Sequence, residues 1–536
     1  MASLNHHPGR GWGYPGGSRR SWAAGLGLWL GLWLGLGLWG CGSGSAGEEI
    51  SDSEGDEDPV EPPTLVEPAD AVEVSAAERL DLTLEAADLL PTTRVELDGE
   101  SWSLTEPGPV VREGQTLRVP LAGAMVVAEH ELVLVHEADG EPLRSDPLTI
   151  SVSASALGPV SAELGPDPVG VGDRLVELSR PGVVALVDAA AETVELRVDD
   201  WAAAGSTLAL PGLTTAAGPS DASVELGFVE RDGGAWLIVA WLAADGGEAR
   251  VRSVAVDADG ALGEAGPVAS VWDLADADAV MSIGPHELVF NRGVALLDRL
   301  VVVAVEARRD AEAATPGDRV LVTRWLDPNA GLADVQVVRG PGGRDLDLPR
   351  QSAAWLDRGS TPALSVRVAQ AYPWLLELGG NGLPTLTSDP GELVSAAGPA
   401  VVWMAAVEGG FGSRTGFALV VEGEQAWLRV LRIDRWGTAP VIAASPVDEI
   451  ALPAVPTAPP SLSLIAGAPA LALGFGPDEP VLLARSTGDA TELEPLALEC
   501  DAVVVERPGP SGESSGSLAL ACLRERALRV GQLTLE

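Results

Sequence analysis

The sequence predicts an all-β protein in which a small β-sandwich precedes a larger region of repeated β-hairpins. Two observations lead to this prediction. Between residues 67 and 155, apolar and polar residues alternate with the period of a strand and show no helical period. Over residues 156–536, strand-length apolar runs recur in pairs, at a mean interval of roughly 56 residues. This second region is too long for one ordinary hydrophobic core.

Composition limits the chemistry that the chain can perform. The 536 residues include 34 Lys+Arg against 78 Asp+Glu, a formal net charge of −44. So acidic a chain cannot neutralise a run of phosphates, which excludes a general nucleic-acid binder. The sequence contains no lysine, so every fixed positive charge on a side chain belongs to an arginine. Chemistry that requires a lysine amine, such as Schiff-base formation, is therefore excluded as well.

Residues 1–40 have the pattern of a signal peptide. Arg19 and Arg20 precede an uncharged stretch of Leu, Trp, Gly and Ala from Trp22 to Gly40, and small residues follow Cys41. A basic start, an apolar middle and a small-residue processing site are the three parts of an export signal. The arginine pair also resembles a twin-arginine signal, so the export route stays open between that route and the general secretory one.

Leu38-Trp39-Gly40-Cys41 resembles the lipobox of bacterial lipoproteins, although Trp39 stands where that family usually has a small residue. The resemblance implies cleavage before Cys41 and acylation of its thiol. We therefore expect a lipid-anchored protein of the bacterial cell envelope, held by the membrane outside the cytoplasm. An uncleaved signal anchor is the alternative, because the 19 residues from Trp22 to Gly40 would nearly span a bilayer at about 1.5 Å per residue.

Residues 41–66 are expected to form a disordered tether after the lipidated cysteine. Glycine and serine come first, then a run of Asp and Glu ending at Glu61, then Pro62 and Pro63. Like charges repel one another and proline stiffens the chain, so this segment should act as an extended spacer.

Residues 67–155 are predicted to form the sandwich. Asp98-Gly99 and Asp139-Gly140 supply the positive φ angles that tight hairpins require. The last two predicted strands, His130–Val135 and Leu148–Val152, resemble the closing strands of immunoglobulin-like domains. This resemblance implies an immunoglobulin-like β-sandwich in which His130 is a packing and hydrogen-bonding residue at a position where such domains often carry tyrosine.

Seven strand pairs recur along residues 156–536, and the region resembles a seven-bladed β-propeller. Radial repetition lets a β-chain exceed the size of one core while leaving only short edges. Runs that are apolar on both faces, such as Trp236–Leu242, predict strands buried between neighbouring sheets. No sequence signature of a propeller family recurs, and a string of further sandwiches would also produce hairpins. The predicted pairs are Val183–Val187 with Thr193–Val198, Ala235–Leu242 with Ala249–Val256, Leu300–Glu306 with Arg319–Trp325, Ala363–Ala369 with Trp374–Leu378, Phe417–Val421 with Ala426–Ile433, Ala470–Phe475 with Val481–Arg485, and Ser517–Leu523 with Ala527–Leu535.

Cys500 and Cys522 are the cysteines that remain once Cys41 is acylated. They lie on two adjacent predicted strands that an antiparallel turn would bring side by side. Outside the cytoplasm they should form a disulfide, with two buried free thiols as the alternative. This disulfide would hold the last blade together where the ring has to close.

No cofactor is predicted, although the acidic chain makes a divalent cation such as calcium a candidate ligand. Asp257 and Asp259 resemble part of a calcium loop, and Asp273, Asp276 and Asp278 follow soon after. The stretch lacks the third carboxylate and the distant glutamate of such a loop, so a hairpin turn explains it better. These five aspartates are weak metal candidates.

Two classes of function are consistent with the sequence. The first is a non-catalytic binding or scaffold surface for an envelope protein or glycan, carried by the loops of the propeller. The second is a propeller-type enzyme, a hydrolase, lyase or quinone-dependent dehydrogenase, that works in the central channel. No constellation of catalytic residues stands out, so no catalytic residue is predicted and the binding surface is favoured.

Overall fold

The computed structural model describes most of residues 61–535. The longest gaps in the description lie at 214–223, 274–286, 309–318, 338–352 and 387–400, and few side chains are described between 273 and 402. The described residues form strands and turns without any helix, as the sequence predicts. It follows that this part of the chain contains no helix long and apolar enough to cross a membrane. The signal peptide, Cys41 and most of the predicted tether lie outside the described residues.

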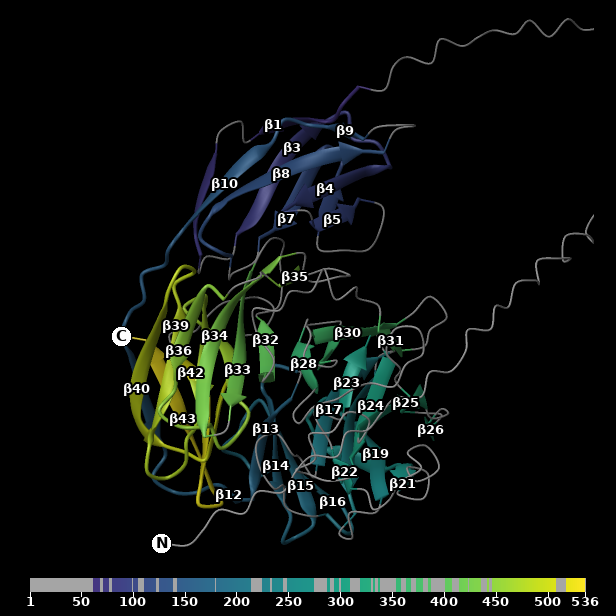
Figure 1. Ribbon diagram of the computed structural model, residues 1–536, viewed down its shortest axis with the longest axis vertical. Helices are drawn as coiled ribbons and strands as arrows, with labels where there is room; N and C mark the ends of the chain where they lie inside the picture. Colours follow the sequence, from purple (N-terminus) through teal and green to yellow (C-terminus); the bar gives the residue numbers. More distant parts are fainter. Residues whose placement is uncertain are drawn as a thin grey trace, which may run out of the picture. The chain divides into compact units, whose positions relative to one another are not determined.

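The first ten strands form two sheets (Figure 1). One has the order β1-β3-β7-β6, and the other has the order β2-β10-β8-β4-β5 with β9 beside β8. Strand β1 begins inside the predicted tether, because Leu65 packs against the core of these sheets. The strands are β1 (Thr64–Glu67), β2 (Val72–Ser75), β3 (Asp81–Ala87), β4 (Thr93–Leu97), β5 (Glu100–Ser103), β6 (Val111–Glu113), β7 (Thr116–Pro120), β8 (Glu129–His136), β9 (Leu143–Arg144) and β10 (Leu148–Ser153).

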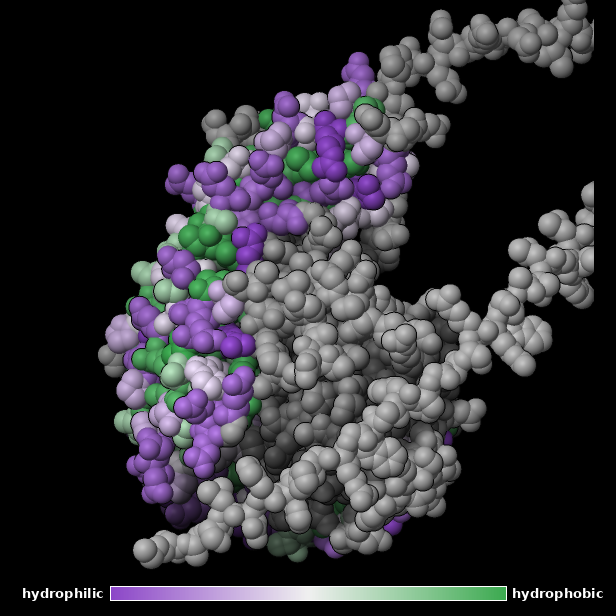
Figure 2. All heavy atoms as spheres, in the orientation of Figure 1, coloured by the Kyte–Doolittle hydropathy of each residue, from purple (hydrophilic) through white to green (hydrophobic). Residues whose placement is uncertain are grey.

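These two sheets share one hydrophobic core and so form a β-sandwich. Leu84 and Leu117 enter the core from the first sheet, and Leu97, Leu132 and Ile150 enter it from the second. Exposed and buried residues alternate along β3, as the period of a strand requires. The outward residues are mostly polar, and hydrophilic residues cover most of the coloured surface that Figure 2 draws.

The remaining strands form six sheets. We call them sheets 1 to 5, in chain order, and the closing sheet, which contains both the first and the last strands. Sheet 1 holds β13 (Arg174–Glu177), β14 (Val183–Asp188), β15 (Thr193–Val198) and β16 (Ser206–Ala209). Sheet 2 holds β17 (Val224–Arg231), β18 (Gly234–Leu242), β19 (Glu248–Val256), β20 (Leu262–Ala265) and β21 (Ala269–Asp273). Sheet 3 holds β22 (Glu287–Val289), β23 (Val294–Leu297), β24 (Leu300–Arg308), β25 (Arg319–Asp327), β26 (Gly331–Leu332) and β27 (Gln336–Val337).

Sheets 4 and 5 and the closing sheet complete this set. Sheet 4 holds β28 (Ala353–Asp357), β29 (Ala363–Arg367), β30 (Pro373–Leu378), β31 (Pro384–Leu386), β32 (Val401–Ala406), β33 (Arg414–Glu422), β34 (Gln425–Asp434), β35 (Val441–Ile442) and β36 (Asp448–Ala451). Sheet 5 holds β37 (Ser461–Ile465), β38 (Ala468–Leu473), β39 (Pro480–Ser486) and β40 (Thr491–Glu499). The closing sheet holds β11 (Val160–Leu164), β12 (Gly170–Val171), β41 (Ala502–Val505), β42 (Ser517–Arg524) and β43 (Ala527–Leu535).

All seven predicted hairpins are antiparallel strand pairs, but two of them belong to one sheet. The hairpins β29–β30 and β33–β34 both lie in the nine-stranded sheet 4. Strands β28 and β32 run in the same direction and pair over Leu356↔Met404 and Asp357↔Ala405. This short parallel contact joins two modules that the sequence analysis treats as separate.

Successive sheets share cores through the two faces of their strands. Along β14, Val183, Ala185 and Val187 belong to a core that sheet 1 shares with sheet 2. The alternate residues, Val184 and Leu186, belong to a core that sheet 1 shares with the closing sheet. Sheet 5 is sandwiched in the same way, with one core toward sheet 4 and another toward the closing sheet. This two-sided burial explains why these strands are continuous apolar runs.

The closing sheet joins the start of this region to the end of the chain. Strand β11 pairs antiparallel with β43, from Val160↔Leu535 to Leu164↔Gly531, and β12 pairs with β43 further along. A side chain at Gly531 would bring its Cβ within 1.9 Å of the Glu163 carbonyl oxygen, so this close approach requires glycine. The closing sheet therefore contains strands from both ends of the repeated region. The chain runs from β12 into sheet 1, and it enters β41 from sheet 5.

The predicted disulfide is present in the closing sheet. Cys500 and Cys522 are bonded, with their Cα atoms 5.6 Å apart. Cys500 lies just before β41 and Cys522 lies on β42, and both are buried in the core between sheet 5 and the closing sheet.

Replacing both cysteines by serine should lower the free energy of unfolding by roughly 3 kcal/mol, because the open chain regains the entropy that the cross-link removed. Chemical unfolding of the oxidised protein and of the double variant at one pH measures the difference. Equal midpoints with equal slopes would show that the disulfide contributes nothing.

Candidate functional site

The first candidate site lies where β13 of sheet 1, β37 of sheet 5 and β41 of the closing sheet meet. The Ser461 hydroxyl, at the start of β37, donates a hydrogen bond of 2.9 Å to Glu177 Oε2 at the end of β13. The same hydroxyl accepts a hydrogen bond of 3.1 Å from the Val505 amide on β41. One buried serine therefore links three sheets, and we call this group the inner cluster.

Charged residues in the inner cluster are paired with one another. Arg507 Nε lies 2.7 Å from Glu177 Oε1, on the side of β13 that faces the closing sheet. On the other side of β13, Arg174 donates to the Val224 carbonyl and lies 3.5 Å from Glu225 Oε1 on β17. Opposite charges in contact compensate each other's desolvation. The described part of the inner cluster is thus a set of links between sheets, with each acid next to an arginine.

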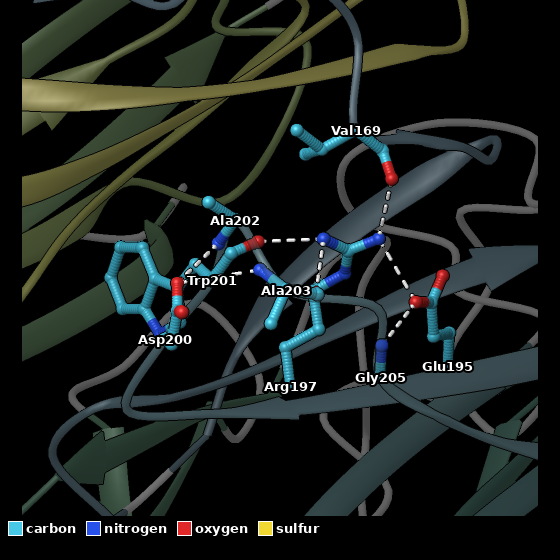
Figure 3. Close-up of polar contacts among 8 residues, drawn as sticks. All are labelled: Val169, Glu195, Arg197, Asp200, Trp201, Ala202, Ala203 and Gly205. Carbon is cyan, nitrogen blue, oxygen red and sulfur yellow. Dashed lines mark hydrogen bonds and ion pairs between the residues drawn. The ribbon is translucent and has the colours of Figure 1, made fainter.

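The second candidate site is the buried guanidinium of Arg197 on β15 (Figure 3). Only 2% of Arg197 is exposed. Its Nη1 donates to the carbonyls of Trp201 at 2.6 Å and Ala203 at 2.9 Å, and its Nη2 donates to the Val169 carbonyl at 2.8 Å. Nη2 also lies 2.9 Å from Glu195 Oε1, which accepts the Gly205 amide as well. One side chain therefore ties sheet 1 to the segment that leads into β12.

A second buried arginine, Arg485 on β39, has the same arrangement at the other end of that segment. Its Nη1 donates to the Gly158 carbonyl at 2.7 Å, and its Nη2 bonds Glu494 Oε2 at 2.7 Å. Gly158 lies two residues before β11, and Val169 directly precedes β12. The chain that completes the closing sheet is therefore held by arginines from sheet 5 and from sheet 1, the sheets that flank it. We call residues 158–172 the closing segment.

Arg526 adds an ion pair between the closing sheet and sheet 1. It occupies the β42–β43 turn with a φ of 69°, and its guanidinium reaches Asp173 at 2.9 Å and Asp188 at 2.8 Å. Its carbonyl also accepts the Gly172 amide. Three arginines thus fix the closing segment and its continuation to neighbouring strands.

The buried guanidinium groups of Arg197 and Arg485 bind oxygen atoms. A guanidinium is permanently charged and presents several N–H donors in a fixed plane, so it suits clusters of main-chain carbonyls. The Nε atoms of Arg197 and Arg485 are buried and have no hydrogen-bond partner among the described residues.

Of the five metal candidates, Asp257 and Asp259 are the two whose side chains the structure describes. Asp257 Oδ1 accepts the amides of Asp259 and Ala261, at 3.0 and 2.7 Å, in the turn between β19 and β20. This turn, in which Gly260 has a φ of 79°, accounts for the resemblance of residues 257–260 to part of a calcium-binding loop. The side chains of Asp273, Asp276 and Asp278 lie outside the described residues. No group of three or more metal-ligating side chains occurs among those that are described.

His130 is buried in the sandwich between two acceptors. Its Nδ1 lies 2.5 Å from Asp98 Oδ2, and its Nε2 donates to the Val126 carbonyl at 2.8 Å. Burial lowers the pKa of His130, but the hydrogen bonds to Asp98 and Val126 and the charge of Asp98 outweigh it, even with Arg432 acting against them. The net pKa is raised above 6.5. A carboxylate and a carbonyl can only accept, so the two contacts favour the imidazolium.

The sequence did not predict that Arg197 and Arg485 are buried and hold the closing segment. The available signal was a charged residue inside an otherwise buried strand, as Arg197 is within β15 and Arg485 within β39. Such a residue must find partners when it is buried. The partners that join sheets are the Val169 carbonyl, 28 residues from Arg197, and the Gly158 carbonyl, 327 residues from Arg485, and such distant partners leave no trace in the residue pattern.

Comparison with known proteins does not identify a family. No protein-family model and no curated protein matches the chain. Among solved structures, it is similar to Trypanosoma rangeli sialidase in complex with the inhibitor DANA, at 9% identity and a TM-score of 0.31, over 58% of this chain and 55% of that one. The chain thus spans little more than half the length of that sialidase.

Two other solved structures are similar at the same low level. Citrobacter koseri AztD shares 12% identity at a TM-score of 0.23, over 69% of this chain and 92% of that one. A Bacteroides fragilis protein named as an exported one shares 7% identity at a TM-score of 0.25, over 72% and 98%. Scores this low support no argument about activity, so the function has to be argued from the chain itself.

Replacing Arg197 by alanine should cost about 3–5 kcal/mol of unfolding free energy, because it leaves Glu195 and three carbonyls without their buried donor. Arg252→Ala is the matched control. From a partly exposed position, its Nε donates to the Gly266 carbonyl and its Nη1 donates, at 3.4 Å, to the Ala209 carbonyl, so the loss should be about 1 kcal/mol. Chemical unfolding measures both. Similar losses for the two variants would contradict the special role of Arg197.

His130 should stabilise the sandwich most at low pH. Because its pKa is raised on folding, its contribution is complete below the unfolded value and is lost as pH rises through the folded value. We expect His130→Gln to weaken protection of β8 amides from hydrogen exchange, relative to wild type, more at about pH 5 than at about pH 9. Asp98→Asn should show the same trend. A pH-independent difference would exclude a charged His130.

Proposed function

We propose that this chain is an exported, lipid-anchored protein of the bacterial cell envelope whose seven-bladed β-propeller is a non-catalytic binding or scaffold surface. The observation that carries the proposal is the pairing of β11 with β43, which joins the first strand of the repeated region to the last. In an array of separate sandwiches each module closes on itself, and no such pairing is required. In a ring, the first and last strands must meet.

The order of shared cores supports the same arrangement. Sheet 1 shares cores with sheet 2 and with the closing sheet, and sheet 5 shares cores with sheet 4 and with the closing sheet. Each of these sheets packs against the next one along the chain, and the last packs against the first. The joined sheet 4 then contributes two of the seven blades, which meet at the β28–β32 contact.

The inner cluster supports a binding role over catalysis. Ser461, Glu177 and Arg507 bond one another across three sheets, so their polar groups already serve contacts within the protein. A catalytic acid or base must be able to exchange protons with a substrate. The surface loops between strands are then the parts that can vary to recognise a partner, which we propose to be an envelope protein or glycan.

The anchor can be tested by changing one residue. Wild-type protein should sediment with the membrane and carry acyl groups on its amino-terminal peptide, whereas Cys41→Ser should carry none and lose the lipid anchor. Mass spectrometry of that peptide and fractionation of the cell measure both effects. A Cys41→Ser protein that is still cleaved and still sediments with the membrane would contradict lipid anchoring.

The binding role can be tested on isolated cell-wall material. The released mature protein should co-sediment with it and show no turnover of glycosidase, lyase or quinone-linked dehydrogenase substrates. Pretreating the wall with protease or with a muramidase distinguishes a protein partner from a glycan. The proposal would be overturned if the protein bound neither untreated nor pretreated cell-wall material. It would also be overturned if the protein turned over one of these substrates and Glu177→Gln abolished that turnover.

A further inference from the structure

We propose that the end of the sandwich formed by residues 76 and 125–127 is a docking surface for the turn between β39 and β40, so that the sandwich and sheet 5 move as one rigid body. The occupant of this surface is a segment of the same chain rather than an outside protein. The docking itself rests on contacts within the chain. Its consequence, that the proposed binding surface keeps a fixed orientation relative to the sandwich, rests on the proposed function.

The turn between β39 and β40 is buried, although hairpin turns usually lie at the surface. Gly488 in this turn is buried and has a φ of 102°. A Cβ at this position would lie 2.7 Å from Val127 Cγ2 and 2.8 Å from the Ala76 Cβ. Ala76 directly follows β2, and Val127 lies shortly before β8, so both contacts belong to the sandwich. The fit between the turn and the sandwich therefore requires a residue without a side chain.

The linker that runs from the sandwich to β11 is held to sheet 5 at two points. The Ser155 amide donates a hydrogen bond of 3.1 Å to the Thr487 carbonyl in the same turn. Arg485, at the end of β39, donates to the Gly158 carbonyl at 2.7 Å. The hydroxyls of Ser155 and Ser75 are 2.6 Å apart, which joins the linker to the sandwich as well. A short linker fixed near both ends has little freedom to act as a hinge.

The sandwich holds its own side of the contact in place from inside. His130 Nε2 donates to the Val126 carbonyl at 2.8 Å, and its Nδ1 lies 2.5 Å from Asp98 Oδ2. Met125 and Val126 are 1% and 7% exposed, so the receiving loop belongs to the packed part of the sandwich. Burial and, to a smaller extent, the charge of Arg432 on β34 act to lower the pKa of His130, so sheet 4 also lies near this end of the sandwich.

Separation of the sandwich from sheet 5 would expose groups that are buried on both sides. Ser486 accepts the Gly488 amide at 3.2 Å and is 2% exposed, and Ala76 on the sandwich side is 4% exposed. Bringing apolar surface into water is unfavourable, and the hydrogen bond between Ser155 and Thr487 would be lost as well. The docked arrangement is therefore the stable one.

Hydrogen exchange of the full-length chain tests the docking. Gly488→Val should speed exchange of the Ser155 amide about tenfold or more, because a branched side chain cannot enter the surface and the linker loses its hold. Gly476→Val is the matched control. Gly476 lies before the other end of β39, has a φ of 104°, and a Cβ there would have its nearest contacts at 3.8 Å. This control carries the same backbone strain without the clash, so it should change the rate about twofold at most.

A cross-link covers the case in which Gly488→Val does not fold. Oxidation of the Ala76→Cys, Gly488→Cys protein should join the two positions. A disulfide needs its Cβ atoms about 3.5–4.5 Å apart, so the 2.8 Å approach of these positions has to widen only slightly. The Ala76→Cys, Gly476→Cys protein is the control and should not be joined. Mass spectrometry of peptides prepared without reduction measures both.

Two results would overturn the proposal. One is exchange at Ser155 that a folded Gly488→Val protein leaves unchanged, or that Gly476→Val accelerates equally. The other is cross-linking of the two cysteine pairs to the same extent, including no cross-linking of either. Failure of membrane anchoring or of wall binding would leave both measurements unaffected, so the two proposals fail separately.

Discussion

The antiparallel pairing of β11 with β43 is the contact on which the rest of the structure depends. Among the described residues, sheets 1 and 5 are apolar on both faces, and both faces of each are covered by neighbouring sheets. A strand that is apolar on both faces can be stable only if both are covered. Sheet 1 and the closing sheet can obtain this cover only from each other. The pairing of β11 with β43, which places Leu164 opposite Gly531, brings them together. Without it, two apolar faces would remain exposed to water.

Buried arginines repeat one solution to the problem of joining sheets. Arg197 and Arg485 each combine a carboxylate on their own sheet with a carbonyl of the closing segment. Burial of a guanidinium is favourable only when its donors are satisfied, so each arginine fixes the position of the chain that supplies the carbonyl. In a chain without lysine, all such contacts between sheets use the planar guanidinium, which can serve several acceptors at once.

The acidic composition has different consequences at the surface and in the interior. At the surface, the excess of carboxylates repels other negatively charged groups. In the interior, Glu177, Glu195 and Glu225 each lie next to an arginine. The sandwich uses the same principle with histidine, because Asp98 pairs with His130 below its surface. The interior is therefore locally neutral even though the chain as a whole is strongly negative.

The sequence by itself determined the class of fold, the seven hairpins and the Cys500–Cys522 pair. These follow from local periodicity and from cysteines that an antiparallel turn places side by side. It predicted the Asp257 turn over a calcium loop for the same reason, since the turn is made by residues within four positions of one another. The partners of β11, the parallel join at β28 and β32, and the contacts of Arg197 with Val169 and of Arg485 with Gly158 were decided by the tertiary structure alone. Each of them joins residues far apart in sequence, and only the cost of leaving an apolar face or a charge without cover selects such partners.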